Sequence, residues 1–327
     1  MLRPDRRGFL AGSAAFVAMG ASGARAQAAA WSPNRPIEMV IMAGAGGGAD
    51  QLARLFQSII QENRLTSMPI LPTNKGGGSG AEALRYLQDK RGDPHVVMAT
   101  LNSYYTTPLR QDIGVDIAEF TPLARMALDT FALWVSADSE IETVDDYVQA
   151  ARDAGGAWRM GGTGTGQEDS LVTALLEQAF DVRHTYVPFD GGGTVAKSLV
   201  GGHVDATVNN PSEQVGFLQA GRVRPLATLT PERLPIMPDV PTLTELGHPV
   251  VYEMQRSFVG PPGMPPEAVA FYEDLFRQLS ETEDWRAYAE ESALVTDFLT
   301  GADLQAYLLA ERDKHAALLE QTEGGAG

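Results

Sequence analysis

The sequence predicts an α/β fold of two lobes, each built on a mostly parallel sheet flanked by helices. Short β-rich runs alternate with helical periodicity from Pro36 to about residue 102, which is the pattern of βαβ units in an open parallel sheet. The alternation restarts at residue 131, and amphipathic helices finish the chain. We therefore expect a first lobe in 27–130, a second in 131–252, and a return to the first lobe in 253–327.

Hydrophobic patterning predicts the elements of the first lobe. IEMVIMA (37–43), MPILPTN (68–74) and HVVMATLN (95–102) predict strands, and GGGSGAEALRYLQDK (76–90) leads into a helix between the last two. The helix after the first strand has apolar residues at the i, i+3, i+4, i+7 and i+8 positions of one buried face: Leu52, Leu55, Phe56, Ile59 and Ile60.

The second lobe repeats this alternation. The predicted strands are FALWVSAD (131–138), WRM (158–160), HTYVPF (184–189), VDATVNN (204–210) and VRPLATLT (223–230), with helices between them. A proline-rich stretch, 231–249, predicts an ordered surface excursion. The strand YEMQRSFVG (252–260) then returns to the first lobe, followed by two amphipathic helices, 265–291 and 300–323.

The N-terminal residues have the pattern of a secretory leader. Arg6 and Arg7 form a pair, an uncharged stretch runs from Gly8 to Ala24, and Ala24-Arg25-Ala26 is a small-x-small cleavage signal. The pair is similar to the twin-arginine type of leader. The stretch is too short and too rich in small residues for a membrane anchor, so we expect residues 1–26 to be cleaved during export to a bacterial periplasm.

Charge and cysteine content exclude several functions. Cleavage removes four arginines and one aspartate, which leaves 21 basic and 41 acidic residues and a net charge of −20. Such a protein repels nucleic acid and anionic lipid. The sequence contains no cysteine, so disulfides, zinc-thiolate sites and thiol nucleophiles are excluded. We expect a soluble, unanchored protein without a metal or a cofactor.

The glycine turns raise the alternative of a nucleotide site or an enzyme. Gly44 to Ala49 match G-x-G-x-x-A between a strand and a helix, but the second strand ends in Asn74 and Lys75 without the acidic residue that binds a ribose. GGGTVAKS (191–198) lacks the glycine that precedes the lysine of a Walker A loop. The five histidines have no tight metal-ligand spacing, and GGSGA (77–81) falls short of a nucleophile elbow.

One local motif occurs repeatedly: a glycine-rich turn with flexible backbone at the start of a helix. AGAGGGAD, NKGGGSGAE, GGTGTGQED and DGGGT each precede a helix, two in each lobe. Glycine lets a ligand approach the main chain, and unpaired amides at a helix N-terminus favour negative charge. Four such turns predict a carboxylate pocket made of amides and small hydroxyls. Asp50, Glu168 and Asp169 lie at helix starts and either cap the first turn or orient water and ligand.

The order of these motifs resembles the solute receptors of tripartite tricarboxylate transporters, also called Bug proteins. RPIEMVIMAGAGGGADQLAR (35–54) is similar to the family opening, and NKGGGSGAEAL (74–84) to its second glycine loop. YVPFDGGGTVAKSLVGGHVDATVNN (186–210), LQAGRVRPLAT (218–228) and MPDVPTLTELG (237–247) follow in family order. The resemblance covers essentially the whole mature chain.

The resemblance implies a Venus-flytrap receptor without catalysis, a monomer that delivers a small organic acid to integral-membrane components. GGTGTGQED and VNNPSE resemble a branch with tricarboxylate receptors, which favours a di- or tricarboxylate. The first loop lacks the P-F-x-x-G-G pattern of many relatives, and Arg256 is either a ligand for a distal carboxylate or a surface arginine. The implied ligand-binding residues are Gly46, Gly47, Gly48, Asp50, Gly78, Ser79, Asn102, Ser103, Thr163, Gly164, Thr165, Gly166, Gly192, Gly193, Thr194, Asn209 and Arg256.

The rival hypothesis is an exported α/β enzyme acting on a nucleotide or an ester. Amides recognise a carboxylate group and leave the rest of the ligand to shape. The sequence therefore does not name the acid, the membrane partner or a role in signalling.

Overall fold

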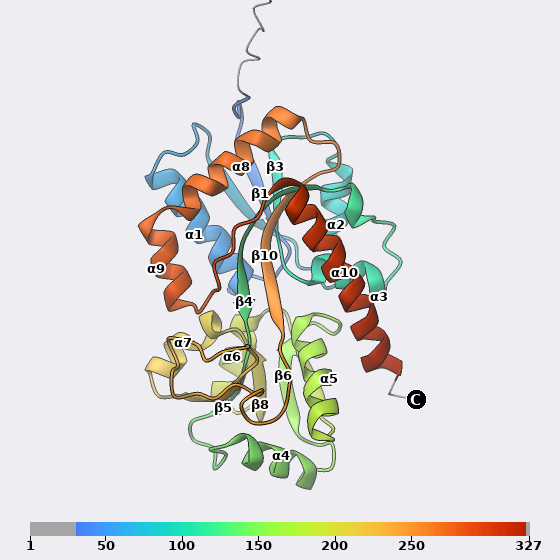
Figure 1. The fold of residues 1–327 in the computed structure, drawn as a ribbon, viewed down its shortest axis with the longest axis vertical. Coiled ribbons are helices and arrows are strands. Elements are labelled where there is room, and N and C mark those ends of the chain that lie inside the picture. The colour runs from blue at the N-terminus through green and yellow to red at the C-terminus, as the bar shows by residue number, and fades with distance from the viewer. Residues whose placement is uncertain (1–30, 325–327) are drawn as a thin grey trace, which may run out of the picture. The chain divides into compact units, whose positions relative to one another are not determined.

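Ten strands form two five-stranded sheets in the described part of the computed structural model, residues 31–324 (Figure 1). Side chains are described as far as residue 320. The predicted leader, residues 1–26, lies outside the described residues. The two sheets match the two predicted α/β units.

The first sheet, sheet A, has the strand order β2-β1-β3-β10-β4. Strands β2, β1 and β3 are parallel to one another, and β10 is antiparallel to both of its neighbours. The central strands are almost fully buried, as continuous apolar runs such as IEMVI and VVMAT require. The strand bounds are β1 Ile37–Ile41, β2 Ile70–Asn74, β3 Val96–Thr100, β4 Thr121–Thr130 and β10 Glu253–Gly260.

The second sheet, sheet B, has the equivalent order β7-β6-β8-β5-β9. Strands β7, β6 and β8 are parallel, and β5 is antiparallel to β8 and β9. The bounds are β5 Ala132–Ser136, β6 Arg159–Thr163, β7 Thr185–Phe189, β8 Ala206–Asn209 and β9 Val223–Thr228. Four of five strands therefore run the same way in each sheet, so each sheet is mixed but mostly parallel.

The antiparallel strand of each sheet is the one that arrives from the other sheet. β4 of sheet A continues through Phe131 into β5 of sheet B, and segment 229–252 connects β9 back to β10. The two connections are bonded to each other: Leu229 N donates to Phe131 O (2.9 Å) and Tyr252 N donates to Leu229 O (3.0 Å). The rings of Phe131 and Tyr252 pack at 5.5 Å between centroids, so one buried apolar cluster runs through both sheets.

Helices flank both sheets. Figure 1 shows α1, α2, α3, α8 and α9 around sheet A and α4 to α7 around sheet B, with the last helix beside α3 and α5. Their bounds are α1 Gly48–Glu62, α2 Ala81–Asp89, α3 Ser103–Arg110, η1 Ile117–Glu119, α4 Val144–Asp153, α5 Glu168–Phe180, α6 Gly192–Val200, α7 Pro211–Gln219, α8 Pro266–Ser280, α9 Glu283–Glu291 and α10 Gly301–Gly324.

The structure corrects two parts of the sequence interpretation. Residues 103–130, which patterning left unassigned, contain α3, the short η1 and the ten-residue β4. The helix predicted over 265–291 is two helices, because Thr282 starts a new one: its side chain accepts a hydrogen bond from Trp285 N. A threonine in this capping position satisfies an amide that a continuous helix would bond internally.

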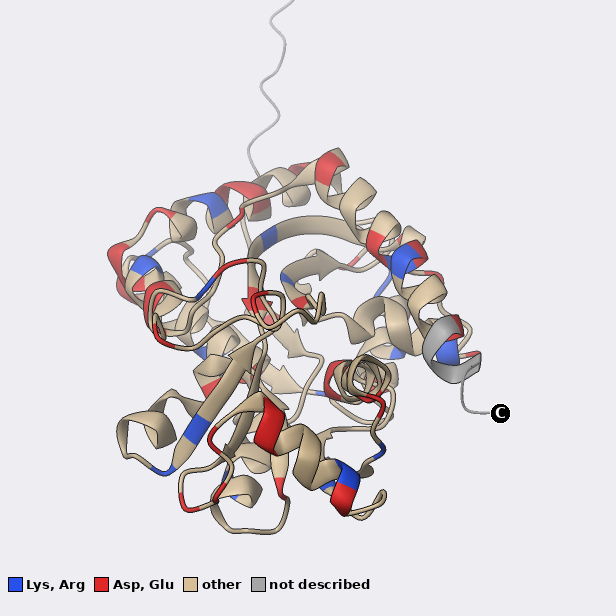
Figure 2. Cartoon of the chain, turned by 60° about the horizontal axis from the view of Figure 1, so that its bottom comes forward, with Lys and Arg blue, Asp and Glu red and all other residues tan. Residues whose placement is uncertain are grey.

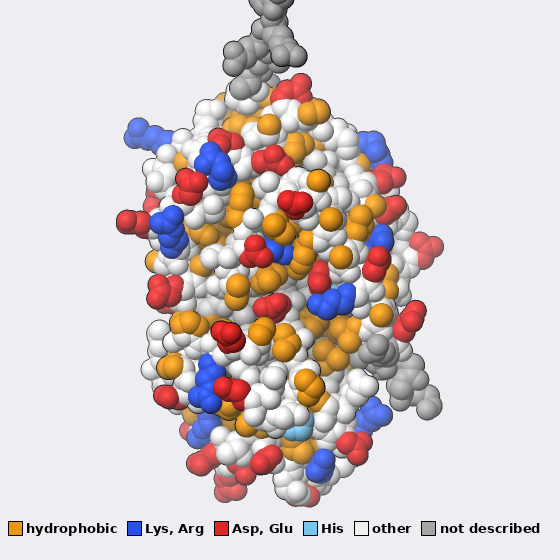
Figure 3. Space-filling view, in the orientation of Figure 1, with side chains coloured by type: hydrophobic (Ala, Val, Ile, Leu, Met, Phe, Trp, Pro, Cys, Tyr) orange, Lys and Arg blue, Asp and Glu red, His pale blue; other side chains and the backbone are white. Residues whose placement is uncertain are grey.

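Charged side chains of both signs are interspersed over the described surface. Figure 2 shows acidic and basic residues mixed along the helices and loops, and on the face in Figure 3 the basic side chains do not merge into one patch. On that face the basic side chains form no continuous footprint for nucleic acid. Among residues 31–324, no helix combines the length and the apolar composition needed to cross a membrane.

Candidate functional site

The glycine turns of the two sheets meet face to face. The turn before α1 contacts the turn before α6 so closely that side chains have no room. A Cβ on Gly44 would lie 2.3 Å from Asp190 O, and a Cβ on Gly193 would lie 2.5 Å from Gly46 O. Real Cβ atoms do not approach within 3.0 Å of such atoms, so glycine at these positions permits the contact between the two sheets' loops.

A cavity of about 40 Å³ lies where these turns meet. Its wall comes from the turn before α1 with Leu101, Met254 and Arg256 on one side, and from the starts of α5, α6 and α7 on the other. This volume holds about two or three water molecules. This volume is smaller than an organic acid of several carbon atoms.

The turns before α1 and α5 have the same backbone geometry. Gly46 and Gly166 have positive φ (82° and 86°), and each donates its N–H to the side chain four residues later, Asp50 Oδ2 (2.8 Å) and Ser170 Oγ (2.8 Å). Position 48 of the first turn thus corresponds to Glu168 of the second. The start of α1 presents bare amide, whereas the start of α5 presents a carboxylate.

Glu213 on α7 places its carboxylate against the start of α1. Gly48 N donates to Glu213 Oε1 (2.9 Å), and Asn209 Nδ2 donates to Oε2 (2.9 Å). The carboxylate lies directly over Gly192, where a Cβ would be 2.0 Å from both of its oxygens. The amide at this helix N-terminus therefore binds a carboxylate in the structure, as a helix dipole favours.

Glu168 makes an equivalent contact with the start of α3. Ser103 N donates to Glu168 Oε1 across the two sheets. Glu168 is only 3% exposed. Burial raises its pKa to about 7, against the opposing effect of hydrogen bonds from its own amide and from Ser103 and of the charge of Arg256.

Two further acidic residues, Asp169 and Asp190, and one arginine, Arg256, complete the charged residues of the lining. Burial and the neighbouring Glu213 and Glu168 raise the pKa of Asp169 well above its usual range, although Thr163 N donates to it (2.9 Å). Arg256 is 3% exposed and bonds through Nε to Asp129 Oδ2 (2.9 Å). Arg256 is therefore a buried, paired cation and not an ordinary surface arginine.

The structure places the predicted ligand-binding residues in three groups. Five of them line the cavity: Gly47, Gly48, Thr163, Gly192 and Arg256. Seven others contact a lining residue or connect the loops of sheet A with those of sheet B: Gly46, Asp50, Ser79, Ser103, Thr165, Gly193 and Asn209. The remainder lie outside the lining: Gly78, Asn102, Gly164, Gly166 and Thr194.

Asp50 has the capping role rather than a place in the lining. Its carboxylate accepts from Gly46 N, Arg54 Nε (2.9 Å) and Asn74 Nδ2 (3.0 Å). Burial alone would raise its pKa, but these hydrogen bonds lower it below the usual value. The ionised carboxylate therefore fixes the turn before α1, whose residues Gly47 and Gly48 line the cavity.

Glu213, Asn210 and Met254 line the cavity but were not among the predicted residues. Glu213 follows β8 at the start of α7, so the rule that ligands bind beyond the carboxyl ends of strands would have included it. Glu168 and Asp169 were noted only as caps or orienting groups.

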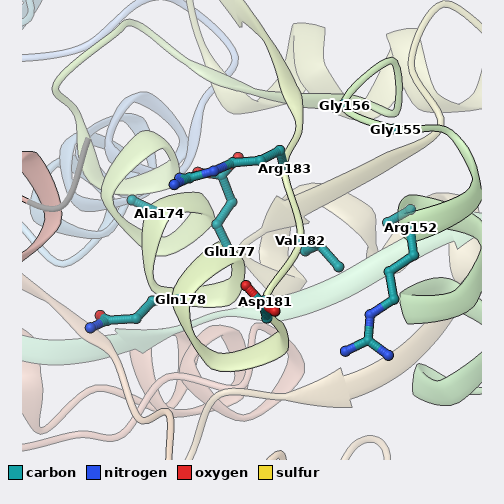
Figure 4. A pocket seen from close by; sticks show the side chains of 10 residues that line it. Arg152, Gly155, Gly156, Ala174, Glu177, Gln178, Asp181, Val182 and Arg183 are labelled. Atoms are coloured by element: carbon teal, nitrogen blue, oxygen red, sulfur yellow. The ribbon is translucent and has the colours of Figure 1, made fainter. Parts of the chain in front are cut away.

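A larger hollow of about 530 Å³ lies where α4 and α5 end (Figure 4). Its two arginines already have partners: Arg183 Nη1 is 3.6 Å from Glu177 Oε2, and Arg152 Nη2 donates to Phe180 O (2.8 Å). The hollow borders the beginning of β6, whereas the cavity borders its carboxyl end. We therefore assign the candidate site to the smaller cavity.

Glu168 makes the free energy of unfolding depend on pH. Because its pKa is raised in the folded protein, this free energy falls as the pH rises. From about pH 4.5 to about 7 the folded protein retains a proton that the unfolded chain has released. Folding is therefore destabilised as the pH rises through this window, by about 1.4 kcal/mol per unit of pKa shift. We expect Glu168→Gln to melt at a higher temperature than the wild type at about pH 8, with the difference shrinking towards about pH 5.

Thermal unfolding at several pH values measures this difference, with Glu290→Gln on the exposed face of α9 as the matched control. A difference between Glu168→Gln and the wild type that is the same at every pH would contradict the assignment.

The comparisons with known proteins identify the family. The model of the tripartite tricarboxylate transporter family receptor matches residues 52–321. The chain belongs to this family. The glycine turn before α1 precedes the matched range, whereas the turns before α2, α5 and α6 lie inside it.

Individual relatives agree with the family assignment. The UPF0065 protein in the gbd 5' region of Cupriavidus necator is 26% identical over 322 residues, covering 97% of this chain and 98% of the relative. The structure of R. palustris Rpa4515 with adipate is 25% identical with a TM-score of 0.83, covering 89% of this chain and 98% of that chain. MatC from Rhodopseudomonas palustris with bound malate is 21% identical with a TM-score of 0.81, covering 88% and 100%. These likenesses confirm the predicted fold.

Proposed function

We propose that this receptor-family protein acts in the periplasm, where it binds a small organic carboxylate between its two sheets and delivers it to the membrane components of a tripartite tricarboxylate-type transporter. The hydrogen bond from Gly48 N to the carboxylate of Glu213 supports this function most directly, because the start of α1 already holds the group that the ligand would present. Family membership supports the transporter partner.

The mode of binding is hinge closure. We propose that segments 27–130 and 253–327 form one lobe and 131–252 the other, and that the monomer bends at its two connections, around Phe131 and between β9 and β10. The small volume of the cavity supports this motion. A ligand of several carbon atoms needs the cleft to open before it enters, and the lobes then close around it. Gly47, Gly48, Gly192, Thr163 and Arg256 are the first contacts that we propose, with the other predicted residues available in the opened cleft.

A di- or tricarboxylate is the ligand class that the sequence favoured. Adipate bound to Rpa4515, a relative 25% identical to this chain, supports a dicarboxylate. The rival hypothesis of an exported enzyme receives no support. Membership of a receptor family supports a binding protein over an enzyme.

A thermal-shift screen tests the proposal. The mature protein, residues 27–327, is heated with adipate, malate, citrate, glutamate and a nucleotide in turn. A ligand at 100 times its dissociation constant adds about 2.7 kcal/mol of stability, so we expect at least one organic acid to raise the melting temperature by several degrees. A rise with the nucleotide and with none of the acids would contradict the proposed function.

A further inference from the structure

The start of β10 is held by a side chain as well as by backbone. β3 ends at Thr100, which pairs with Ser257 of β10, so position 102 lies opposite position 255. There the buried side chain of Asn102 takes over the pairing: its Nδ2 donates to Glu253 O (3.0 Å) and its Oδ1 accepts from Gln255 N (3.0 Å). Asn102 therefore fixes the strand where the chain returns from sheet B to sheet A.

A directed chain of hydrogen bonds begins at Asn102. Its Nδ2 also donates to the hydroxyl of Tyr252 (3.1 Å), which uses the second hydrogen of the amide. The hydroxyl then donates its own hydrogen to His315 Nε2 (3.1 Å), and His315 Nδ1 donates to Glu311 O (2.8 Å), because a carbonyl only accepts. This order leaves Nε2 without a hydrogen, so the chain requires a neutral His315. We call Asn102, Tyr252 and His315 the hinge clasp.

Tyr252 connects the hinge clasp to sheet B. Its N donates to Leu229 O (3.0 Å) just beyond the end of β9, and its ring packs against Phe131 in the other connection (5.5 Å between centroids). Its hydroxyl bonds to Asn102, which follows β3, and to His315 on α10. One side chain thus links both connections between the sheets to sheet A and to the last helix.

The hinge clasp also adjoins the contacts between the two sheets at the site. α3 begins directly after Asn102, and Ser103 N donates to Glu168 at the start of α5. α10, which carries His315, contacts both α3 and α5 (Figure 1). A shift of Asn102 or of α10 therefore moves groups that meet between the sheets.

A groove of about 570 Å³ between α5, segment 249–253 and α10 leads to the hinge clasp. Tyr252 and His315 both line this groove, although His315 is only 1% exposed. A proton added to His315 Nε2 turns the acceptor of the chain into a donor that faces the hydroxyl of Tyr252. The hydroxyl must then turn its hydrogen away, and the bond that joins Tyr252 to α10 is lost.

Resting on the hinge motion of the proposed function, we propose that the hinge clasp is a proton-sensitive lock. It holds the hinge while His315 is neutral, and protonation of His315 releases it. Mild acid therefore loosens the start of β10 and the cross-sheet contact of Ser103, whereas neutral pH keeps both in place.

The surroundings of His315 favour its neutral form. Burial lowers the pKa of His315 below its ordinary value and Lys314 acts in the same direction, whereas the carbonyl and the carboxylate of Glu311 oppose them. The folded protein therefore binds this proton more weakly than the unfolded chain. The stability of the neutral clasp is present above about pH 6.5 and is lost as the pH falls from there through the folded pKa.

The other ionisable groups near His315 come from three elements. They are Glu311 and Lys314 on its own helix, Tyr105 on α3, and Tyr252 and Glu253 where the chain enters β10. The part of α5 that lines the groove, Leu175, Gln178 and Ala179, adds none. Of these groups, Glu311 alone brings a carboxylate close to the ring, with Oε2 3.6 Å from Nδ1.

Hydrogen exchange of the mature protein without ligand tests the lock. Mass spectrometry follows peptides that contain the amides of Tyr252, Gln255 and Ser103 at about pH 7.5 and about pH 5, on either side of the ordinary histidine pKa, after correction for intrinsic exchange rates. We expect the protection of these amides in the wild type to be at least about fivefold lower at the lower pH.

His315→Gln removes the titration and keeps an acceptor for Tyr252, since the side-chain oxygen of glutamine carries no proton at either pH. We expect its protection to be the same at both pH values. Glu168 titrates in both proteins, so the difference between them reports on His315. His203→Gln, in the exposed turn after α6, is the matched control and is expected to behave as the wild type.

Tyr252→Phe keeps the ring against Phe131 but lacks the hydroxyl, so we expect low protection at both pH values. The proposal is overturned by an equal loss of protection in His315→Gln and the wild type, by no loss in the wild type, or by full protection of Tyr252→Phe at about pH 7.5. Because no ligand is present, each of these outcomes leaves the proposed function to the thermal-shift screen.

Discussion

Replacing Arg256 with methionine is expected to lower the free energy of unfolding by about 3–5 kcal/mol, the range found when one partner of a buried ion pair is removed. Arg256 and Asp129 are 3% and 1% exposed in their side chains. The substitution leaves Asp129 without its guanidinium and leaves Glu213 and Glu168 without the one cation that lowers their pKa. Methionine fills similar space, so the effect reports on charge.

Urea unfolding at neutral pH measures this change. Arg233→Met is the control, because Arg233 forms an ion pair with Glu245 in which both side chains are more than 40% exposed, and exposed pairs contribute about 0–1 kcal/mol. A double substitution, Arg256→Met with Asp129→Leu, is expected to regain much of the stability because it leaves no unpaired member of the ion pair. If Arg256→Met costs no more than Arg233→Met, the ion pair does not have the role assigned to it.

Much of the site was predictable because strand ends and helix starts are local features of the sequence. The alternation of β-rich runs and helices predicted two sheets, and the carboxyl ends of parallel strands meet at one edge. Gly47, Gly48 and Gly192 therefore line the cavity as the glycine turns suggested. Arg256 was a candidate from its place in the returning strand YEMQRSFVG, but its burial beside Asp129 is not visible in the sequence.

The acidic part of the lining was not predictable, because its contacts join residues far apart in the chain. Glu213 contacts Gly48 across 165 positions, and Glu168 contacts Ser103 across 65. At its helix start, Glu168 resembles an ordinary capping residue. The sequence predicted mostly parallel sheets but not which strands run the other way: β5 and β10 are antiparallel because each enters its sheet from the other one.

Filling the contact between the two glycine turns is expected to weaken ligand binding by at least about tenfold, or 1.4 kcal/mol, without harming the fold. Gly193 is the second residue of α6, where alanine is a better helix former than glycine by about 1 kcal/mol. Its Cβ would nevertheless lie 2.5 Å from Gly46 O, so Gly193→Ala prevents the two turns from closing fully.

Gly216→Ala is the matched control. Gly216 lies inside α7, and a Cβ there meets nothing within 4 Å. The same gain in helix propensity is therefore expected without any obstruction between the turns.

The calorimetric affinity of Gly193→Ala, compared with that of Gly216→Ala, tests most directly whether the glycine turns close around the ligand. The probe is the acid that gives the largest thermal shift with the wild type. We expect a loss of tenfold or more in Gly193→Ala, wild-type affinity in Gly216→Ala, and a melting temperature without ligand that neither substitution lowers. Wild-type affinity in Gly193→Ala would contradict this expectation, because the ligand would then bind without closure of these two turns.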